Sequence, residues 1–265
     1  MAVIAGRGAL PAALVAGLSD RPLVACLDGF APDGLTPDVS FRIERLMPFL
    51  DLLADRGISD VTFAGAVMRP RLDPALIDPA TAQLLPRLMA AMARGDDATL
   101  REVITIFEEF DLNVIGLADI APGLLPGPGV HAGRPTAADE ADATRAATIV
   151  AALGAVDVGQ GAVVQQGLCL GVETLAGTDA LLVAVAALPA ALRPDPGQGR
   201  GLFYKAPKPG QDLRIDLPTI GIATVDRVAD AGLGGIAWAA DGVICLDLTG
   251  MQVRAAARGL FLWAR

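Results

Sequence analysis

The polar side chains best suited to chemistry gather in one short run of this chain, KAPKPGQDLRIDLPTIG, at residues 205–221. Pro207, Pro209 and Gly210 exclude a regular helix here, so the run predicts a loop with a restricted backbone. The candidate site residues in it are Lys205, Lys208, Gln211, Asp212, Arg214 and Asp216. So many charged groups between apolar strands indicate a site for a charged ligand.

This mixture of charges suits hydrolysis at a diphosphate. Two lysines and an arginine can neutralise the phosphates. Either Asp212 or Asp216 can orient or deprotonate a water molecule, or hold a divalent cation that does so. The alternative is a solvated charged loop with local ion pairs, which explains less well why an otherwise apolar chain brings these groups together.

Two glycine turns add a second candidate region. IAGRGALP at residues 4–11 and FAGAVMRP at residues 63–70 each end a short apolar strand in glycine, and Arg69 follows the second. Backbone N–H groups at such turns can cradle phosphate, so Gly6, Gly8 and Gly65 are expected along one crevice. Pro11 replaces the third glycine of a dinucleotide fingerprint, and no acidic residue clearly follows at the expected distance. Ordinary strand–helix turns are the alternative.

Two further segments hold carboxylates. In RGDDATLR, residues 94–101, Asp96 or Asp97 can cap the following helix, or can hold Mg²⁺ or a ribose hydroxyl. Glu173 ends an otherwise apolar strand and needs a partner, because a buried unpaired carboxylate is costly. That partner is a metal or ligand in one interpretation and a salt bridge in the other. Thr178 or Asp179 is expected to cap the next helix.

The elements that position these residues alternate along the chain. Strands are expected near 3–5, 23–27, 61–64 and 113–116, and helices near 10–18, 46–56, 81–94 and 97–110. This alternation predicts a parallel, Rossmann-like sheet covered by helices. Residues 121–135 are rich in Pro and Gly and indicate a linker. We therefore expect two α/β domains, a Rossmann-like domain at 1–130 and a mixed α/β domain at 131–265.

In the second half, a helix is expected near residues 138–153, strands near 162–165 and 168–172, and another helix near 179–187. The single histidine, His131, falls in the expected linker and is predicted to be solvated.

Composition excludes several classes of function. The net charge of −9 argues against bulk nucleic-acid binding, which depends on an excess of cations. No secretory signal and no uncharged apolar run of about 20 residues is evident, so we expect a soluble, cytoplasmic protein. Cys26, Cys169 and Cys245 stand apart in apolar runs and predict small buried side chains in a reducing compartment.

Taken in order, the motifs resemble the LpxI-type UDP-2,3-diacylglucosamine pyrophosphatases, over nearly the whole chain. They are IAGRGALP, FAGAVMRP, RGDDATLR, DVGQGAVV, GVETLAGTDALL and KAPKPGQDLRIDLPTIG. The resemblance implies cleavage of UDP-2,3-diacylglucosamine by direct attack of water, giving UMP and 2,3-diacylglucosamine 1-phosphate (lipid X), a step in lipid A biosynthesis. It also implies a divalent cation, Mg²⁺ or Mn²⁺, and two α/β domains with the substrate between them. Such a protein would meet its lipid-linked nucleotide-sugar substrate peripherally, at the inner face of the inner membrane, with a homodimer as one candidate assembly.

The resemblance also assigns residues. The family's essential aspartate falls on Asp216, its KxxKP lysines on Lys205 and Lys208, its glutamine on Gln211, and its GTD on Thr178 and Asp179. The predicted site therefore has Asp216 as the catalytic residue and Asp216 and Asp212 as candidate metal ligands. The predicted substrate-binding residues are Gly6, Gly8, Gly65, Asp97, Gln165, Thr178, Asp179, Lys205, Lys208, Gln211 and Arg214. This chain departs from the family pattern at Arg7, which interrupts a glycine run, and at Ala66, where a polar residue is common.

Two other functions remain open on sequence alone. A nucleotide- or dinucleotide-dependent oxidoreductase built on the Gly6–Gly8 turn would carry a bound nicotinamide or flavin. A lipid or nucleotide carrier would bind its ligand tightly without turnover.

Overall fold

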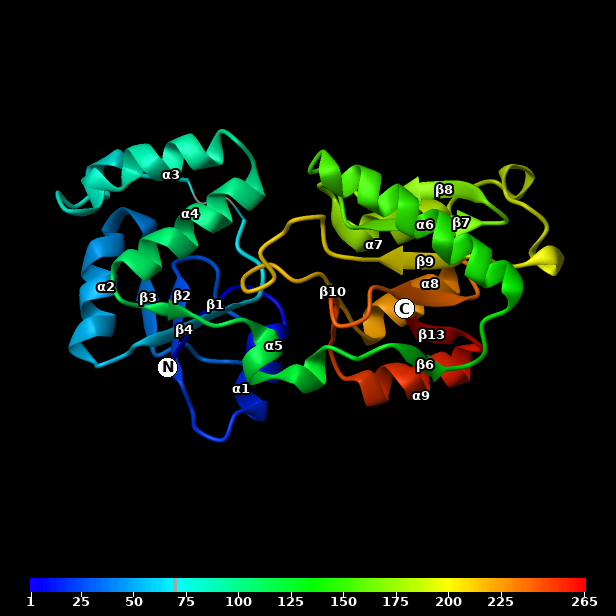
Figure 1. Cartoon of the computed structure of the whole chain (residues 1–265), viewed down its shortest axis with the longest axis horizontal. Coiled ribbons are helices and arrows are strands. Elements are labelled where there is room, and N and C mark those ends of the chain that lie inside the picture. Colours follow the sequence, from blue (N-terminus) through cyan, green and yellow to red (C-terminus); the bar gives the residue numbers. More distant parts are fainter. Residues whose placement is uncertain (69–70) are drawn as a thin grey trace. The chain divides into compact units, whose positions relative to one another are not determined.

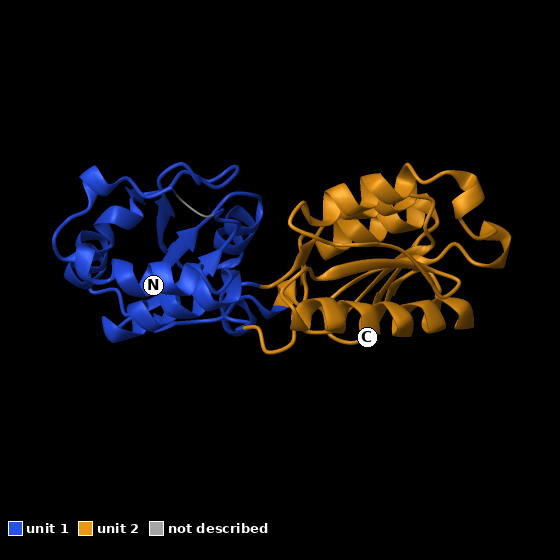
Figure 2. Cartoon of the chain, turned by 90° about the horizontal axis from the view of Figure 1, so that it is seen from above, with its two compact units in different colours: residues 1–122, 212–216 blue, residues 123–211, 217–265 orange. Residues whose placement is uncertain are grey.

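The computed structural model describes residues 1–68 and 71–265, and the chain forms two compact units (Figures 1 and 2). Unit 1 comprises residues 1–122 together with 212–216, and unit 2 comprises residues 123–211 and 217–265. The polar run at 205–221 thus leaves unit 2, contributes five residues to unit 1, and returns. Arg69, noted above beside the second glycine turn, lies outside the described residues.

Unit 1 is built on a parallel five-stranded sheet with the order β3-β2-β1-β4-β5. Its strands are β1 (Ala2–Ala5), β2 (Leu23–Leu27), β3 (Val39–Phe41), β4 (Asp60–Ala64) and β5 (Asn113–Val114). The chain winds outward from β1 in one direction through β2 and β3, and in the other through β4 and β5. The carboxyl ends of β1 and β4 therefore flank a topological switch point, where ligands bind in open parallel sheets.

Helices of unit 1 cover this sheet through apolar faces. They are α1 (Leu10–Gly17), α2 (Leu46–Asp55), α3 (Leu85–Met92), α4 (Asp96–Glu109) and α5 (Leu117–Ile120). The core joins Leu50 and Leu53 of α2 and Phe107 of α4 to the strands, and Ile215, from the returning segment, packs against it. Burial of that side chain gives the segment 212–216 a hydrophobic anchor in unit 1.

Unit 2 contains a mixed six-stranded sheet with the order β6-β13-β11-β9-β7-β8. Its strands are β6 (Gly129–Ala132), β7 (Gly161–Gln165), β8 (Leu168–Val172), β9 (Leu202–Lys205), β11 (Gly235–Trp238) and β13 (Phe261–Ala264). The three central strands β9, β11 and β13 are parallel, and β7 runs antiparallel to β9. Two short strands, β10 (Thr219–Ile220) and β12 (Ile244–Cys245), pair separately. The predicted fold class, α/β with a parallel sheet in the N-terminal part, is confirmed.

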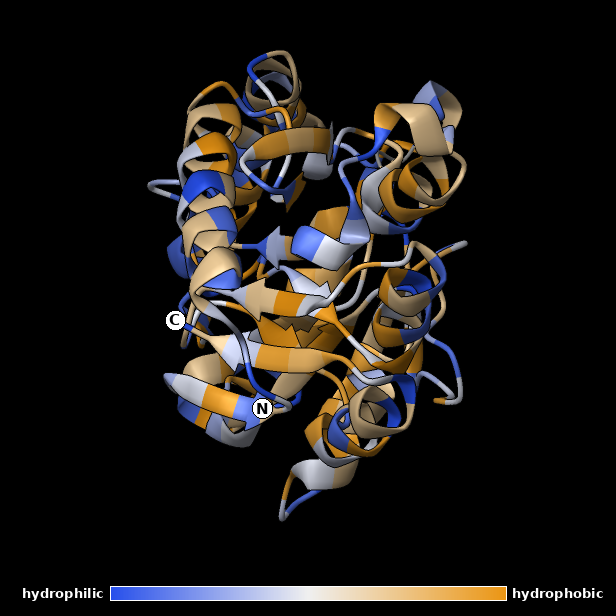
Figure 3. Ribbon diagram, turned by 90° about the vertical axis from the view of Figure 1, so that its right-hand side faces the viewer, coloured by the Kyte–Doolittle hydropathy of each residue, from blue (hydrophilic) through white to orange (hydrophobic). Residues whose placement is uncertain are grey.

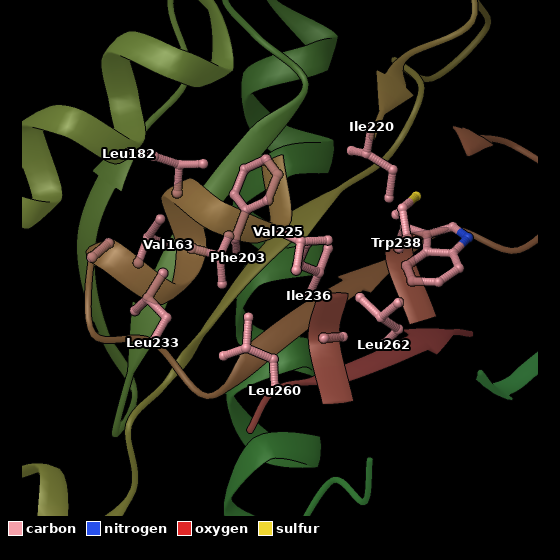
Figure 4. Close-up of a cluster of buried hydrophobic side chains, with 14 of the residues drawn as sticks. Val163, Leu182, Phe203, Ile220, Val225, Leu233, Ile236, Trp238, Leu260 and Leu262 are labelled. Carbon is pink, nitrogen blue, oxygen red and sulfur yellow. The ribbon is translucent and has the colours of Figure 1, made fainter. Parts of the chain in front are cut away.

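Helices lie on both faces of the unit 2 sheet (Figure 1). They are α6 (Ala137–Ala155), α7 (Gly177–Ala186), α8 (Ile222–Asp230) and α9 (Leu248–Arg258). Successive strand residues point to opposite faces, so Ala162 and Val164 pack with α6 while Val163 packs with α7 and α8. Figure 4 shows the cluster on the face of α7 and α8, in which Phe203 and Trp238 are fully buried. The strands are accordingly rich in hydrophobic residues (Figure 3).

Several local expectations from the sequence are wrong. Gly95, not Asp96 or Asp97, is the N-cap of α4, and its φ of 124° is open to glycine alone. Ala176 rather than Thr178 or Asp179 precedes α7. The expected linker at 121–135 contains β6, which pairs with β13.

Two further predictions, one for a histidine and one for a cysteine, are also wrong. His131 is not simply solvated: it is part-buried in β6, with its ring stacked 5.5 Å from that of Trp238. Cys169 is exposed on the edge strand β8, whereas Cys26 and Cys245 are buried as predicted. Within residues 1–68 and 71–265, no helix combines the length and apolar character that a membrane crossing requires.

Candidate active site

The two glycine turns meet at the switch point of the unit 1 sheet. Arg7 and Ala66 exchange backbone hydrogen bonds of 2.9 and 3.0 Å, and Gly6 N–H donates to the Ala64 carbonyl at 2.7 Å. A Cβ on Gly6 would lie 2.6 Å from the Ala66 oxygen, and one on Gly65 would lie 2.6 Å from the Gly6 oxygen. The structure therefore brings Gly6 and Gly65 together, and their close approach leaves no space for a side chain at either position.

The loop after β2 borders this glycine turn. Gly8 accepts a hydrogen bond from the Asp33 N–H, and the Arg7 guanidinium donates to the Gly29 carbonyl at 2.8 Å. The same guanidinium carbon lies 5.1 Å from the centre of the Phe30 ring. Arg7, the residue that interrupts the glycine run, thus holds the β2 loop against the turn.

Asp28 is a residue that the sequence analysis missed. It follows the last residue of β2 directly and stands 20 positions after Gly8. An acidic residue about 20 positions beyond a glycine turn is the usual ribose ligand of this type of sheet. The spacing between Gly8 and Asp28 is visible in the sequence, but it identifies Asp28 only once β2 is known to end at Leu27.

In unit 2, Lys205 at the end of β9 is buried in a polar cluster. Its ammonium donates to Glu173 Oε2 at 2.8 Å, to Glu173 Oε1 at 3.2 Å and to Thr178 Oγ1 at 2.6 Å. The Thr178 hydroxyl donates in turn to Glu173 Oε2 at 2.9 Å. Lys205 is 4% exposed and Glu173 8%. The partner that Glu173 required is therefore a lysine, and the three donors of that lysine all have acceptors.

The segment before β7 supports the first half of the polar run. Gln211 Oε1 accepts from Gln160 Nε2 and from the Lys208 backbone N–H, both at 2.8 Å, and this fixes the turn. The Lys208 ammonium forms an ion pair with Asp157. A Cβ on Gly161 would lie 2.6 Å from Glu173 Oε2, so this glycine makes room for the carboxylate. These roles of residues in the DVGQGAVV motif could not be predicted from the sequence, because they depend on the pairing of β7 with β9.

The second half of the run is tied to α4 within unit 1. Arg214 donates to both oxygens of Asp212, with a shortest distance of 2.7 Å, and to Glu108 at 2.8 Å. The Asp212 carboxylate also accepts the Arg214 backbone N–H at 3.0 Å. The hydrogen bond to the Arg214 guanidinium holds the pKa of Asp212 below its usual range. Asp216 ends this segment and is partly buried.

The described residues contain no group of three or more His, Cys, Asp or Glu side chains placed to hold a metal ion. Asp212, one of the two candidate ligands, is already bonded through both oxygens to Arg214. A cation held by protein side chains alone therefore does not fit these residues. Mg²⁺ commonly needs only one or two carboxylates when substrate phosphates and water complete its shell.

Three other predicted residues lie apart from these clusters. Asp97 pairs with Arg101 one turn along α4, at 3.0 Å. Asp179 lies 3.0 Å from Arg227 Nε of α8. Gln165, which is 1% exposed, bonds to the carbonyls of Pro194 and Gly199. Because β7 is antiparallel to β9, Gln165 lies at the opposite end of the sheet from Lys205.

Comparison with known proteins connects both units to one family. The model of the LpxI N-terminal domain matches residues 1–124, and the model of the LpxI C-terminal domain matches residues 127–263. The chain belongs to the LpxI family. A curated relative, "UDP-2,3-diacylglucosamine pyrophosphatase LpxI" from Caulobacter vibrioides, is 37% identical over 269 residues, covering 99% of this chain and 96% of the relative. The LpxI resemblance inferred from the motifs is thus confirmed.

Proposed function

We propose that this chain hydrolyses the pyrophosphate bond of UDP-2,3-diacylglucosamine, giving UMP and 2,3-diacylglucosamine 1-phosphate in lipid A biosynthesis. The observation that carries this proposal is the 37% identity to the Caulobacter pyrophosphatase, which extends along 99% of the chain. Likeness of that extent includes both units and the polar run at 205–221. The fold alone would not be enough, because one fold serves many functions.

The chemistry of the run agrees with this reaction. A diphosphate resists attack because its anionic oxygens repel the incoming water, and positioned cations offset that charge most strongly in the transition state. Lys208 and Arg214 are held in defined positions by Asp157, Asp212 and Glu108. We assign Asp216 the task of orienting or deprotonating the attacking water. Contact of Lys205 with phosphate remains a prediction, since its ammonium is engaged by Glu173 and Thr178.

We propose Mg²⁺ or Mn²⁺ as the cofactor, shared between Asp216 and the phosphates of the substrate. The family resemblance, which places the essential aspartate on Asp216, favours Asp216 over Asp212 as the ligand from this run. When bound, such a cation would polarise a phosphoryl oxygen. Because the side chains of residues 1–68 and 71–265 do not make a full site by themselves, the substrate would be part of the coordination shell.

We further propose that the protein works in the cytoplasm and meets its substrate peripherally, at the inner face of the inner membrane. The reason is chemical: a substrate with two acyl chains resides in a bilayer, where a protein can reach it from the surface. A flotation assay with vesicles tests the membrane contact. A homodimer is the candidate assembly, and light scattering of the purified chain tests it.

The function is tested with purified protein and UDP-2,3-diacylglucosamine in detergent micelles. We expect UMP and 2,3-diacylglucosamine 1-phosphate in equal amounts by mass spectrometry, and far slower release of UMP from UDP-glucose, which lacks acyl chains. Tight binding of the lipid substrate without turnover, with Mg²⁺ or Mn²⁺ supplied, would instead identify a carrier. A bound nicotinamide or flavin in the purified protein would favour the oxidoreductase.

A further inference from the structure

A small pocket of about 220 Å³ lies at the carboxyl ends of β2 and β3 in unit 1. Asp28 and Phe30 of the β2 loop line one part of it, and Arg42 and Glu44, which follow β3, line another. Pockets that enclose a whole small-molecule ligand usually measure about 300–1,000 Å³. This one is therefore suited to a single ring of a larger ligand.

The pocket borders the glycine turn. The β2 loop that forms one wall is fastened to the turn through the Arg7 guanidinium, which bonds to Gly29 and lies over Phe30, and through the Asp33–Gly8 hydrogen bond. A ligand with its ring in the pocket would thus extend along the carboxyl ends of β2 and β1. That is the edge along which open parallel sheets bind nucleotides.

The polar groups of the pocket have bonding capacity that the described part of the chain does not use. The Asp28 side chain is 59% exposed. Among the described residues its carboxylate makes one hydrogen bond, in which Oδ2 accepts from Arg42 at 3.1 Å. Oδ1 remains available as an acceptor. Arg42 Nε is buried and has no hydrogen-bond partner among the described residues. A ligand that brings both a donor and an acceptor would satisfy these two atoms.

The charges of the pocket favour a neutral polar group. The lining has two carboxylates, Asp28 and Glu44, and two guanidinium groups, Arg42 and Arg71, so it carries no excess of cations. A phosphate would gain little here and would be repelled by the exposed Asp28 carboxylate. Sugar hydroxyls both donate and accept, and they suit a carboxylate beside a guanidinium.

We infer that this pocket holds the ribose of the uridine nucleotide, with Asp28 accepting hydrogen bonds from the ribose hydroxyls. The identity of the nucleotide rests on the proposed function, whereas the ribose site rests on Asp28, the pocket and the strand order. The phosphates then extend toward the turn of Gly6 and Gly8. Asp28 binds the leaving nucleotide and takes no part in the attack of water.

The test compares binding of UMP and of 2′,3′-dideoxyuridine 5′-phosphate to the full chain by calorimetry. The wild type should bind UMP about tenfold or more tightly, because a hydrogen bond to a charged group is worth that much. Asp28→Ala and Asp28→Asn should weaken UMP binding until this preference largely disappears. Asp33→Ala is the matched control, because Asp33 is an exposed carboxylate of the same loop outside the pocket, and it should keep the preference.

Three results overturn the ribose site: no saturable UMP binding, equal binding of both nucleotides by the wild type, or an unchanged preference in both Asp28 variants. Hydrolysis of UDP-2,3-diacylglucosamine is measured separately on the same wild-type sample. Hydrolysis without an Asp28-dependent preference overturns the ribose site and supports the hydrolase. An Asp28-dependent preference without hydrolysis supports the ribose site and overturns the hydrolase.

Discussion

Lys205 and Glu173 form a buried ion pair of 2.8 Å between the end of β9 and the segment that follows β8. The Thr178 hydroxyl bonds to both partners, accepting from Lys205 and donating to Glu173. Removing one charge from such a pair leaves the other uncompensated, whereas removing both can be nearly neutral. The network therefore couples the start of the polar run at 205–221 to the stability of unit 2.

We expect Lys205→Met and Glu173→Leu each to lower the free energy of unfolding by about 3–5 kcal/mol, and the double variant to recover most of that loss. Chemical denaturation of the four proteins measures the coupling. Additive losses would show that the pair is not the coupled unit described above. Turnover of the double variant then separates two roles for Lys205. Restored activity indicates positioning of the loop, and continued inactivity indicates the phosphate contact predicted from the sequence.

Glu173 also shows how far the sequence could predict the site. A carboxylate in an apolar strand implied a buried partner, and the two possibilities were a salt bridge or a ligand. Choosing between them required the register of β7 with β8 and β9, which brings Lys205 to Glu173 across 32 positions of sequence. Asp157 and Gln160 were missed for the same reason, since both reach the run only through that pairing.

The fold was easier to predict than the local boundaries. Strand–helix alternation gave the parallel sheet, because apolar periodicity reports burial directly. The predicted N-caps were wrong because backbone conformation determines the cap: Gly95, with φ of 124°, is the N-cap of α4, and Asp96 is its first helical residue. The strand β6 could not be predicted, because it lies in a Pro- and Gly-rich segment and its stability comes from pairing with β13, which lies far along the chain.

The contact between Gly6 and Gly65 predicts a sharp difference between two glycine substitutions. Gly6→Ala should destabilise the protein by about 1–3 kcal/mol, because the new Cβ would lie 2.6 Å from the backbone oxygen of Ala66. Gly17→Ala is the matched control, since a Cβ there meets no atom within 4 Å. Thermal unfolding of both variants tests this, and equal melting temperatures would contradict the close approach of the two turns.

Asp212 predicts a pH dependence of stability. Its pKa is lowered in the folded protein by the hydrogen bond to Arg214, so folding is favoured when this carboxylate is ionised. The contribution is present above the unfolded-state pKa of about 3.9 and is lost as the pH falls through the lower folded-state value. Solvent limits it to about 1 kcal/mol or less. Denaturation at pH 3 and pH 7 should show a smaller pH effect in Asp212→Asn than in the wild type; the same effect in both would contradict the pairing.

Asp216 should separate catalysis from binding. Asp216→Asn keeps the shape of the side chain but removes the base and the charge, so kcat should fall by at least about 100-fold. KM and the melting temperature should change little. Asp51→Asn, the same change at an exposed residue of α2, serves as the control and should retain the wild-type turnover. Near-normal kcat in Asp216→Asn would exclude Asp216 as the catalytic residue.

Removal of divalent cations should affect turnover but not stability. Because the described residues hold no group of three or more potential metal ligands, a cation bound mainly through substrate phosphates contributes little to folding of the free protein. We expect a chelator to stop UMP release, Mg²⁺ or Mn²⁺ to restore it, and the melting temperature to stay the same throughout. A cation-dependent rise in melting temperature without substrate would contradict the shared site. Turnover that continues in excess chelator would show that the reaction needs no such cation, and the charge of the diphosphate would then be offset by the lysines and Arg214.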